Sequence, residues 1–478
     1  MNAMVIAVVI GLIFIAFLGF IGRKQSFNTN SGWSIGNRSM SSLTTFFLQA
    51  GGIFTSFTFL GMSGLALLGG VSSAYMPAYL IIGYIGMFVM GPLVWKISKI
   101  YGYHTNADMV GHQFSSPLLG KFVAVIAVVF FTPIVQIQII GLGTIVSFST
   151  GEKQAGTVSM VIATILILAF VSWAGLRGVA TTAYFKDVAM IVALVIIIFG
   201  TASKFGTHDL MDTAMAKAEH LFHVAPGTKA FGVNWFISSV IISGIGLGAM
   251  TLPESWPAVL SASKSKGVSK NHVLLPMYTL GTFIPIVLGF YAVNHLVVEK
   301  GQENSAILTL AAQSLPTWLL ALVVISGLSC AMVPAAHCVL SIATLVSMNF
   351  APKGTTDDNK LKIGKIASSA ILLFSLGMSI ARPDLMANLY LLTYAGLAQL
   401  APSNILSVTK QRFIGAPALI GGLIAGECTV IYLLISQYSV FGFNNGVIGL
   451  FINLIVMLGI AAATGPANRP QLPEVSHK

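Results

Sequence analysis

The feature that most restricts this chain is a series of long apolar runs that contain almost no charged residues. Of its 478 residues, 55% are hydrophobic and only 8% are charged, whereas soluble domains average roughly 25% charged residues. Runs of about 20 apolar residues can cross the ~30 Å hydrocarbon core of a bilayer as helices. Backbone polar groups inside lipid must pair within the protein, so we predict an all-α polytopic membrane protein.

Thirteen such runs follow one another along the sequence. They cover residues 3–22, 43–68, 73–98, 119–149, 157–174, 182–203, 232–252, 271–297, 316–348, 361–381, 386–406, 413–436 and 442–464. With an odd number of spans the termini lie on opposite sides, and nineteen of the 25 Lys and Arg residues fall on one side. The positive-inside rule therefore predicts a multi-pass protein of the cytoplasmic membrane, with the N-terminus outside and the C-terminus in the cytoplasm.

Several classes of function find no support in the composition. The net charge of +11 lies in short loops between the runs, which indicates topology rather than a nucleic-acid partner. No GxxxxGK[ST] motif occurs, so we expect no ATP-driven motor, and the three cysteines form no CxxC pair. We expect no cofactor, no metal beyond a weak sodium site, and no partner protein. The first run lacks a small-residue cleavage site and is interpreted as a retained helix.

Two of the runs are interrupted by helix-breaking residues. The second contains "LQAGGIFTSFTFLGMSG" (48–64), in which Gly51 and Gly52 precede three hydroxyl residues. The seventh contains "SGIGLGAMTLPESWP" (243–257), with alternating glycines and two prolines. Small residues can simply allow close helix packing. Two breaks five spans apart, in opposite orientation, instead favour an inverted-repeat transporter whose binding site lies at the bilayer midplane.

The first break predicts a substrate site. The helix restarts near Ile53 to Thr55 and points backbone amides at the midplane, where a carboxylate is favoured. We identified no acidic residue in the midplane core that would capture a cation, so we expect a carboxylate substrate. In the fourth run, Gln136 and Gln138 point to different helix faces, so at most one lines the site, and a tie to a neighbouring helix is an equal alternative.

Charged and titratable residues at membrane depth are functional hypotheses. Glu254 near the inner end of run seven either takes part in coupling or pairs with a loop lysine. Asp187 at the inner start of run six is a second coupling candidate, beside Lys186, which we expect to snorkel. His337 can bind or relay a proton, or serve as a packing residue. Glu427 has no clear role.

Several segments resemble the sodium:solute symporter family in the same order along the chain. They are "SGWSIGNRSM", "FTFLGMSG", "GPLVWKISKIYGYHTNADMVGHQF", "GLRGVATTAYFKD", "LPESWPAVLSASKSKGVSKN" and "AMVPAAHCVLSIATLVSMN", within about residues 30–415. "AGGIFTSFTFLG", "AYFKD" and "MVPAA" are most similar to the branch of bacterial monocarboxylate permeases. The resemblance implies the leucine-transporter fold with a five-plus-five helix core. The expected division is 1–42 (first helix and loop), 43–203 and 232–406 (two repeats), 204–231 (outer loop) and 407–478 (two peripheral helices and tail).

The resemblance also implies roles for residues at the breaks. The backbone carbonyls of Gly51 and Phe54 occupy the family's sodium positions, and Thr58 faces the substrate. We expect the substrate to be bound by Gly51, Gly52, Ile53, Phe54, Thr55, Thr58 and Gln136, with Gly246 and Ala249 from the second break.

Run nine departs from the family pattern at the sodium site. Sodium-coupled relatives place adjacent hydroxyls there, but this chain has Val333, Pro334 and Ala335. Ala183 stands where the family has an acidic residue. Pro334 frees the carbonyl near Cys330, which partly compensates. Hard cations need several oxygen ligands, so we predict coupling to protons or to the solute gradient alone.

The leading hypothesis is therefore a secondary transporter of a small organic solute, a carboxylate such as a monocarboxylate, with a proton or sodium as co-substrate. The alternatives are a sodium-coupled symporter of amino acids or other small solutes, a transporter-like sensor, and a channel. A channel usually shows a charged ring or filter, and we expect no signalling domain after run thirteen. No nucleophile–base pair is evident, so we expect no enzyme.

Overall fold

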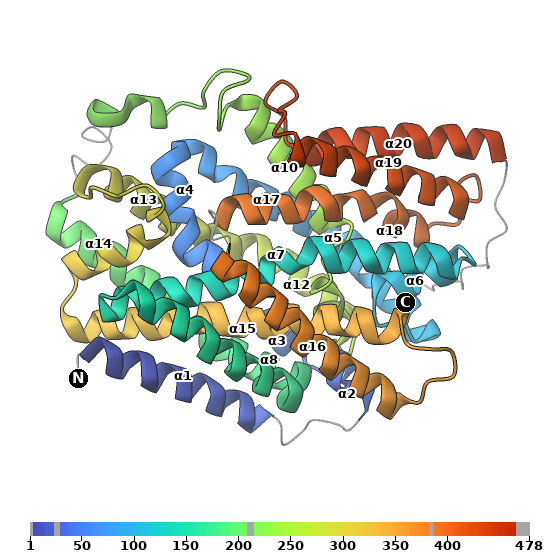
Figure 1. Cartoon of the computed structure of the whole chain (residues 1–478), viewed down its shortest axis with the longest axis horizontal. Coiled ribbons are helices and arrows are strands. Elements are labelled where there is room, and N and C mark those ends of the chain that lie inside the picture. The colour runs from blue at the N-terminus through green and yellow to red at the C-terminus, as the bar shows by residue number, and fades with distance from the viewer. Residues whose placement is uncertain (1–2, 23–28, 208–214, 382–385, 465–478) are drawn as a thin grey trace.

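The computed structural model describes residues 3–22, 29–207, 215–381 and 386–464, and Figure 1 shows how they are arranged. They form helices and short connections, with one isolated bridge between Met40 and Ala262. The helices are α1 (Ala3–Gly22), α2 (Asn30–Ile35), α3 (Ser42–Ala50), η3 (Phe57–Gly61), α4 (Met62–Gly69), α5 (Tyr75–Tyr101), α6 (Asn106–Gln113), α7 (Pro117–Thr150), α8 (Lys153–Phe205), α10 (Val233–Gly248), α11 (Ser255–Leu260), α12 (Ser265–Thr279), α13 (Phe283–His295), α14 (Ala306–Ser314), α15 (Thr317–Asn349), α16 (Asp357–Ala381), α17 (Met386–Leu397), α18 (Ala401–Ser407), α19 (Ala416–Ile435) and α20 (Asn445–Thr464).

Within the described ranges, nine helical segments are long and apolar enough to cross a membrane. Two of them, Phe57–Tyr101 and Ala155–Phe205, each extend over two predicted runs, and the shorter apolar helix α10 covers most of run seven. The all-helical membrane class is thus confirmed, while the count of thirteen spans and the two-fold repeat stay predictions. Both chain ends, 1–2 and 465–478, lie outside the described residues, so the predicted placement of the termini is not tested.

Helix α8 contains the connection between predicted runs five and six. At Gly175 the backbone adopts φ 55° and ψ −160°, which interrupts the helix between the two runs. A β-carbon at this residue would lie 2.9 Å from Cδ1 of Trp33 on α2. The positive φ and the close approach of α2 both require glycine here.

Helix α15 lies at the centre of the molecule. It packs against α7, α8, α16 and α1, and in Figure 1 it runs nearly parallel to α7 through the middle of the view. Helix α1 lies along one edge, and α19 and α20 pair with each other at the opposite side (Figure 1). The residues of α15 from Ser326 to Leu345 are all buried, so any polar group on this stretch faces protein rather than lipid.

The segments around the two helix breaks are joined outside the helices. The amide of Met40, just before α3, donates to the carbonyl of Ser261 at 2.9 Å, and the amide of Ser263 donates back to Met40 at 2.9 Å. Ser41 caps α3 by accepting from the amide of Thr44. These bonds fix α3 beside α11, so the two interrupted helices lie next to each other.

Candidate functional site

The first break lies where the second predicted run was expected to be interrupted. Helix α3 ends at Ala50, residues 51–55 leave the helical path, and the chain resumes in the wide π-turn η3 before α4. The amides of Gly51 and Gly52 still close the last turn of α3, at 2.9 and 3.0 Å from the carbonyls of Phe47 and Gln49. The carbonyls of the break therefore need partners other than the regular helical amides.

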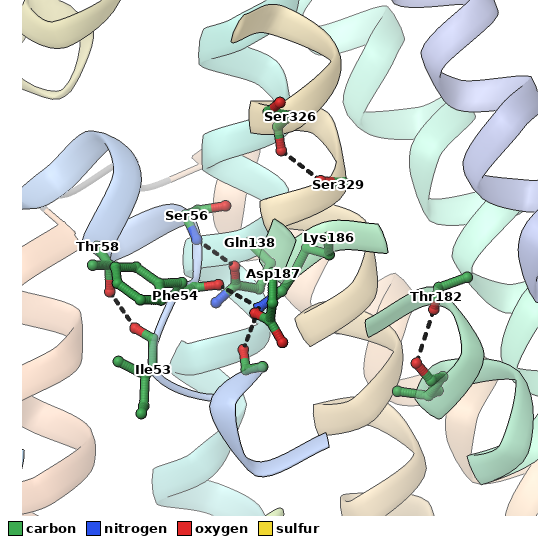
Figure 2. Close-up of polar contacts among 12 residues, drawn as sticks. Ile53, Phe54, Ser56, Thr58, Gln138, Thr182, Lys186, Asp187, Ser326 and Ser329 are labelled. Carbon is green, nitrogen blue, oxygen red and sulfur yellow. Dashed lines mark hydrogen bonds and ion pairs between the residues drawn. The ribbon is translucent and has the colours of Figure 1, made fainter. Parts of the chain in front are cut away.

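One of these carbonyls is satisfied from within the same segment. The hydroxyl of Thr58 donates to the carbonyl of Ile53 (Figure 2). Thr58 is fully buried, so its hydroxyl supports the break itself. The hydroxyls of Thr55 and Ser56 are also buried, and neither has a hydrogen-bond partner among the described residues.

Lys186 supplies the partner for two further carbonyls of the break. Its ammonium donates to the carbonyl of Gly51 at 3.1 Å and to that of Phe54 at 2.8 Å. Its Nζ also lies 2.6 Å from Oδ1 of Asp187, and both side chains are 0% exposed. Figure 2 shows Lys186 reaching from α8 to Phe54 at the break. The expectation that Lys186 snorkels to the membrane surface is therefore wrong, because the break itself solvates the ammonium.

Gln138, not Gln136, is the glutamine of α7 that meets the break. Its Oε1 accepts from the amide of Ser56 at 3.0 Å (Figure 2). The amide nitrogen of Gln136 instead donates to the carbonyl of Met378 on α16 at 3.3 Å. Gln136 thus ties two helices together, which was the alternative to its predicted place at the substrate, and the two-residue spacing turns it away from the break.

The second break separates α10 from α11 and is held by a different set of bonds. Asn404 of α18 donates to the carbonyls of Ala249 and Met250, both at 3.1 Å. The hydroxyl of Thr251 donates to the carbonyl of Gly246 at 2.9 Å. The backbone oxygens of Gly246 and Ala249, which we expected at the substrate, are thus engaged in stabilising the turn.

Both breaks border one internal cavity of about 30 Å³. Six helices and the two breaks line it, through Leu48, Gln49, Gly52, Leu80, Tyr84, Met87, Leu247, Leu252, Glu254, Ser255, Ala258, His337, Tyr390 and Tyr394. This volume holds about two water molecules at roughly 10–15 Å³ each. A larger solute therefore needs the surrounding helices to move apart.

The polar side chains of this cavity include Glu254, Gln49 and His337. Glu254 accepts a hydrogen bond from Sγ of Cys338 at 3.2 Å. Neither amide atom of Gln49 has a hydrogen-bond partner in the described part of the chain, and the same holds for Nε2 of His337. Unpaired polar groups in a buried site are costly, so Gln49 and His337 are available to a solute.

The position and the partner of Glu254 contradict two expectations from the sequence. No ion pair between Glu254 and a loop lysine occurs among the described residues, where the partner found is Cys338. A β-carbon on Gly52 would lie 3.0 Å from Oε1 of Glu254, so an acidic group does lie beside the first break. The argument that the core lacks an acid was wrong, because residue 254 was assigned to the inner end of its run.

An aromatic wall closes one side of the cavity. The rings of Tyr390 and Tyr394 on α17 lie 5.4 Å apart, and Phe57 of η3 stacks on Tyr390 at 4.6 Å. Tyr79 of α5 meets Tyr394 edge-on at 5.1 Å. Such aromatic pairs stabilise a fixed packing beyond the area they bury, so this wall gives the cavity a defined shape on the side of α17.

The central part of α15 offers few ligands for a cation. Val333, Pro334 and Ala335 are buried and carry no side-chain oxygen. Pro334 leaves the carbonyl of Cys330 without its helical donor. The two carbonyls that the family resemblance implies for sodium, those of Gly51 and Phe54, already accept hydrogen bonds from Lys186.

The sequence model of the Sodium:solute symporter family matches residues 33–426 of the chain. The chain belongs to the sodium:solute symporter family. Members of this family are transporters, so the expectation that the protein is not an enzyme is confirmed.

Curated relatives within the family cover most of the chain. It is 27% identical to the uncharacterized symporter YhjB of Bacillus subtilis, over 98% of both chains. It is also 26% identical to a monocarboxylate transport permease protein of Rhizobium johnstonii, over 82% of this chain and 80% of that one. The predicted likeness to monocarboxylate permeases thus has a counterpart among the relatives.

A solved structure shows the same fold. A substrate-bound, outward-open Na⁺-coupled sialic acid symporter superposes with a TM-score of 0.80, covering 99% of this chain and all of that one, at 16% sequence identity. At this identity the likeness concerns the fold of the symporter family and not the solute.

Several residues of the site were not predicted from the sequence, among them Lys186 as a ligand of the break, Gln49 and Cys338. For Lys186 a signal existed, because a charged residue inside an apolar run is a functional candidate by default. Its position at the predicted start of run six instead suggested that the side chain extends to the membrane surface. Gln49 and Cys338 carry no such signal, since only the tertiary fold brings Gln49 to the cavity and Cys338 to Glu254.

Proposed function

We propose that this protein is a secondary transporter that moves a small organic carboxylate, such as a monocarboxylate, across the cytoplasmic membrane by alternating access. The observation that carries the proposal is that two interrupted helices, α3–η3 and α10–α11, border one buried cavity. Breaks of this kind are tolerated in a membrane where they line a site for a solute. They are the equivalent points of two five-helix repeats, 43–203 and 232–406.

The nature of the cavity supports a carboxylate as the solute. Gln49 and His337 present unpaired hydrogen-bonding atoms, and a relative of similar length is named a monocarboxylate transport permease. Glu254 lies in the same cavity. Two carboxylates so close cannot both remain charged, so one of them must carry a proton. Binding of a carboxylate therefore brings a proton with it, and solute and proton cross together.

Sodium has no evident place in this cycle. The carbonyls of Gly51 and Phe54 are bonded by an ammonium, and α15 lacks hydroxyls at residues 333–335. A hard cation needs several oxygen ligands at once. The gradient that drives uptake is thus that of protons, with Glu254 as the group that shares the proton with the solute.

The test is uptake of radiolabelled lactate, pyruvate and acetate into proteoliposomes that contain the purified protein. With a more acidic exterior, we expect at least one of these acids to accumulate above its external concentration, and neutral sugars not to. An E254Q variant should still exchange labelled for unlabelled acid but should lose the accumulation driven by the pH gradient. The sign follows from the shared proton, because uptake consumes protons on the acidic side.

Glu427 provides a matched control for Glu254. It is also a buried acid, on the peripheral helix α19, and its oxygens have no hydrogen-bond partner among the described residues. An E427Q variant should keep pH-driven accumulation. Preferential uptake of sugars would contradict the solute class. Accumulation by E254Q equal to wild type would contradict the proton route, and exchange without any response to pH would leave the solute gradient as the driving force.

A further inference from the structure

The ammonium of Lys186 is buried and is surrounded by oxygen atoms of the protein. Its side chain is 0% exposed. An ammonium has three donors, and two of them are used by the carbonyls of Gly51 and Phe54 at 3.1 and 2.8 Å. The third side of the ammonium faces Asp187, whose Oδ1 lies 2.6 Å away.

These contacts form a small cage of oxygens with one negative charge. The two carbonyls come from the first break and the carboxylate comes from α8, so the cage joins two helices that are distant in sequence. Carbonyl and carboxylate oxygens are ligands suited to hard cations. Emptied of the ammonium, the cage would leave a buried carboxylate uncompensated, which is strongly unfavourable.

We propose that Lys186 is a tethered cation whose ammonium fills, from within the chain, a sodium position formed by the carbonyls of Gly51 and Phe54 and the carboxylate of Asp187. A dissolved ion would enter and leave this position in each transport cycle and so contribute its gradient. The ammonium stays with the protein, keeps the break neutralised, and contributes none. The role of Lys186 in transport rests on the proposed function, because only a transporter has a gradient to which a dissolved ion would contribute.

The proposal has a direct consequence for a variant without the ammonium. In K186A the oxygens of the cage remain, space for an ion opens between them, and the charge of Asp187 is uncompensated. A small monovalent cation then binds there, and binding to the folded state raises stability by mass action. The variant thus acquires a sodium response that the wild-type protein lacks.

The experiment measures thermal melting of the purified full chain in detergent, in sodium chloride or in choline chloride of equal ionic strength. No solute is added, so the result does not depend on whether the transported solute has been identified. The wild-type protein should melt at the same temperature in both salts. K186A should melt several degrees higher in sodium than in choline, with saturation as sodium rises.

Three further variants define the cause. K186A/D187N removes the charge of the cage and should lose the sodium response. K186R retains a cation, and K204A changes an exposed lysine at the far end of the same helix, so both should behave as wild type. Recovery of folded K186A only in sodium also supports the proposal.

A saturable stabilisation of the wild-type protein by sodium would overturn the proposal, because the position would then be open to a dissolved ion. Folded K186A that is indifferent to sodium would overturn it as well, and so would failure of K186A to fold in both salts. If carboxylate uptake fails while the melting results are as expected, the proposed function is refuted but the tethered cation is still supported.

Discussion

At the scale of single residues, the Gly51–Gly52 pair lies between a buried cation and an acid. A β-carbon on Gly51 would lie 3.6 Å from Nζ of Lys186, and one on Gly52 would lie 3.0 Å from Oε1 of Glu254. Glycine is needed at residue 52 for this close approach, not for an unusual backbone angle. The pair therefore leaves room for the ammonium of Lys186 and the carboxyl group of Glu254 beside the break.

A G52L substitution should abolish transport while the protein still inserts into the membrane. The leucine side chain would displace Glu254 and occupy the cavity, and overpacking of this kind costs about 1–3 kcal/mol of stability. Uptake in proteoliposomes and the yield of monodisperse protein measure the two effects separately. Transport by G52L at the wild-type rate would show that the break is not part of the solute pathway.

Residue chemistry also decides what the sequence could predict of the site. The glycines, prolines and hydroxyls predicted where the helices break, because those residues weaken helices regardless of the fold. The partners of the break were not predictable in the same way. Lys186, Gln138 and Asn404 reach it from α8, α7 and α18, and only the tertiary arrangement selects them among other polar residues.

At the scale of helices, each break is held by side chains from neighbouring helices. The amide of Ser56 at the first break depends on Gln138 of α7. The carbonyls of Ala249 and Met250 at the second depend on Asn404 of α18. Backbone groups that leave a helix inside a membrane require such partners. Movement of α7 or α18 relative to the breaks would therefore change the geometry of the cavity.

Gln138 and Gln136 form a matched pair for testing this dependence. A Q138L variant leaves the buried amide of Ser56 unpaired, at a cost of about 1–3 kcal/mol, and should lower the rate of uptake tenfold or more. Q136L loses a bond to Met378 of α16, away from the break, and should transport close to the wild-type rate. Equal loss in both variants would indicate a general destabilisation of α7.

The boundaries of long helices were more predictable than the connections between consecutive helices. Helices α1, α7, α15 and α20 begin and end within about three residues of the predicted runs, because apolar length sets them. The connections in Phe57–Tyr101 and Ala155–Phe205 were predicted as gaps between runs. In the structure the helices continue almost directly into each other there, since short turns around Gly70 and Gly175 replace loops.

At the scale of the whole molecule, the fold of the symporter family places both breaks at one cavity that is too small for an organic solute in this conformation. Alternating access then requires the helices around α3 and α11 to part on one side at a time. A ligand can drive such a change only by its differential affinity for the two states. The solute and its proton provide that difference in our proposal, and Lys186 does not.

The orientation predicted from the basic loops belongs to this scale too. Lys300 and Lys266 are both exposed, and the positive-inside rule places Lys300 outside and Lys266 in the cytoplasm. In a background without native cysteines, a membrane-impermeant maleimide should label K300C in intact cells and K266C only after permeabilisation. The reverse pattern would invert the predicted topology.

The most direct test of the account is uptake of a carboxylate into wild-type proteoliposomes with sodium replaced by choline, at matched pH gradient and membrane potential. Because Lys186 already provides the cation at the first break, we expect the rate and the level of accumulation to stay the same in both salts. A tenfold or greater drop in choline, equivalent to about 1.4 kcal/mol of coupling, would contradict the account and show that a dissolved sodium ion takes part.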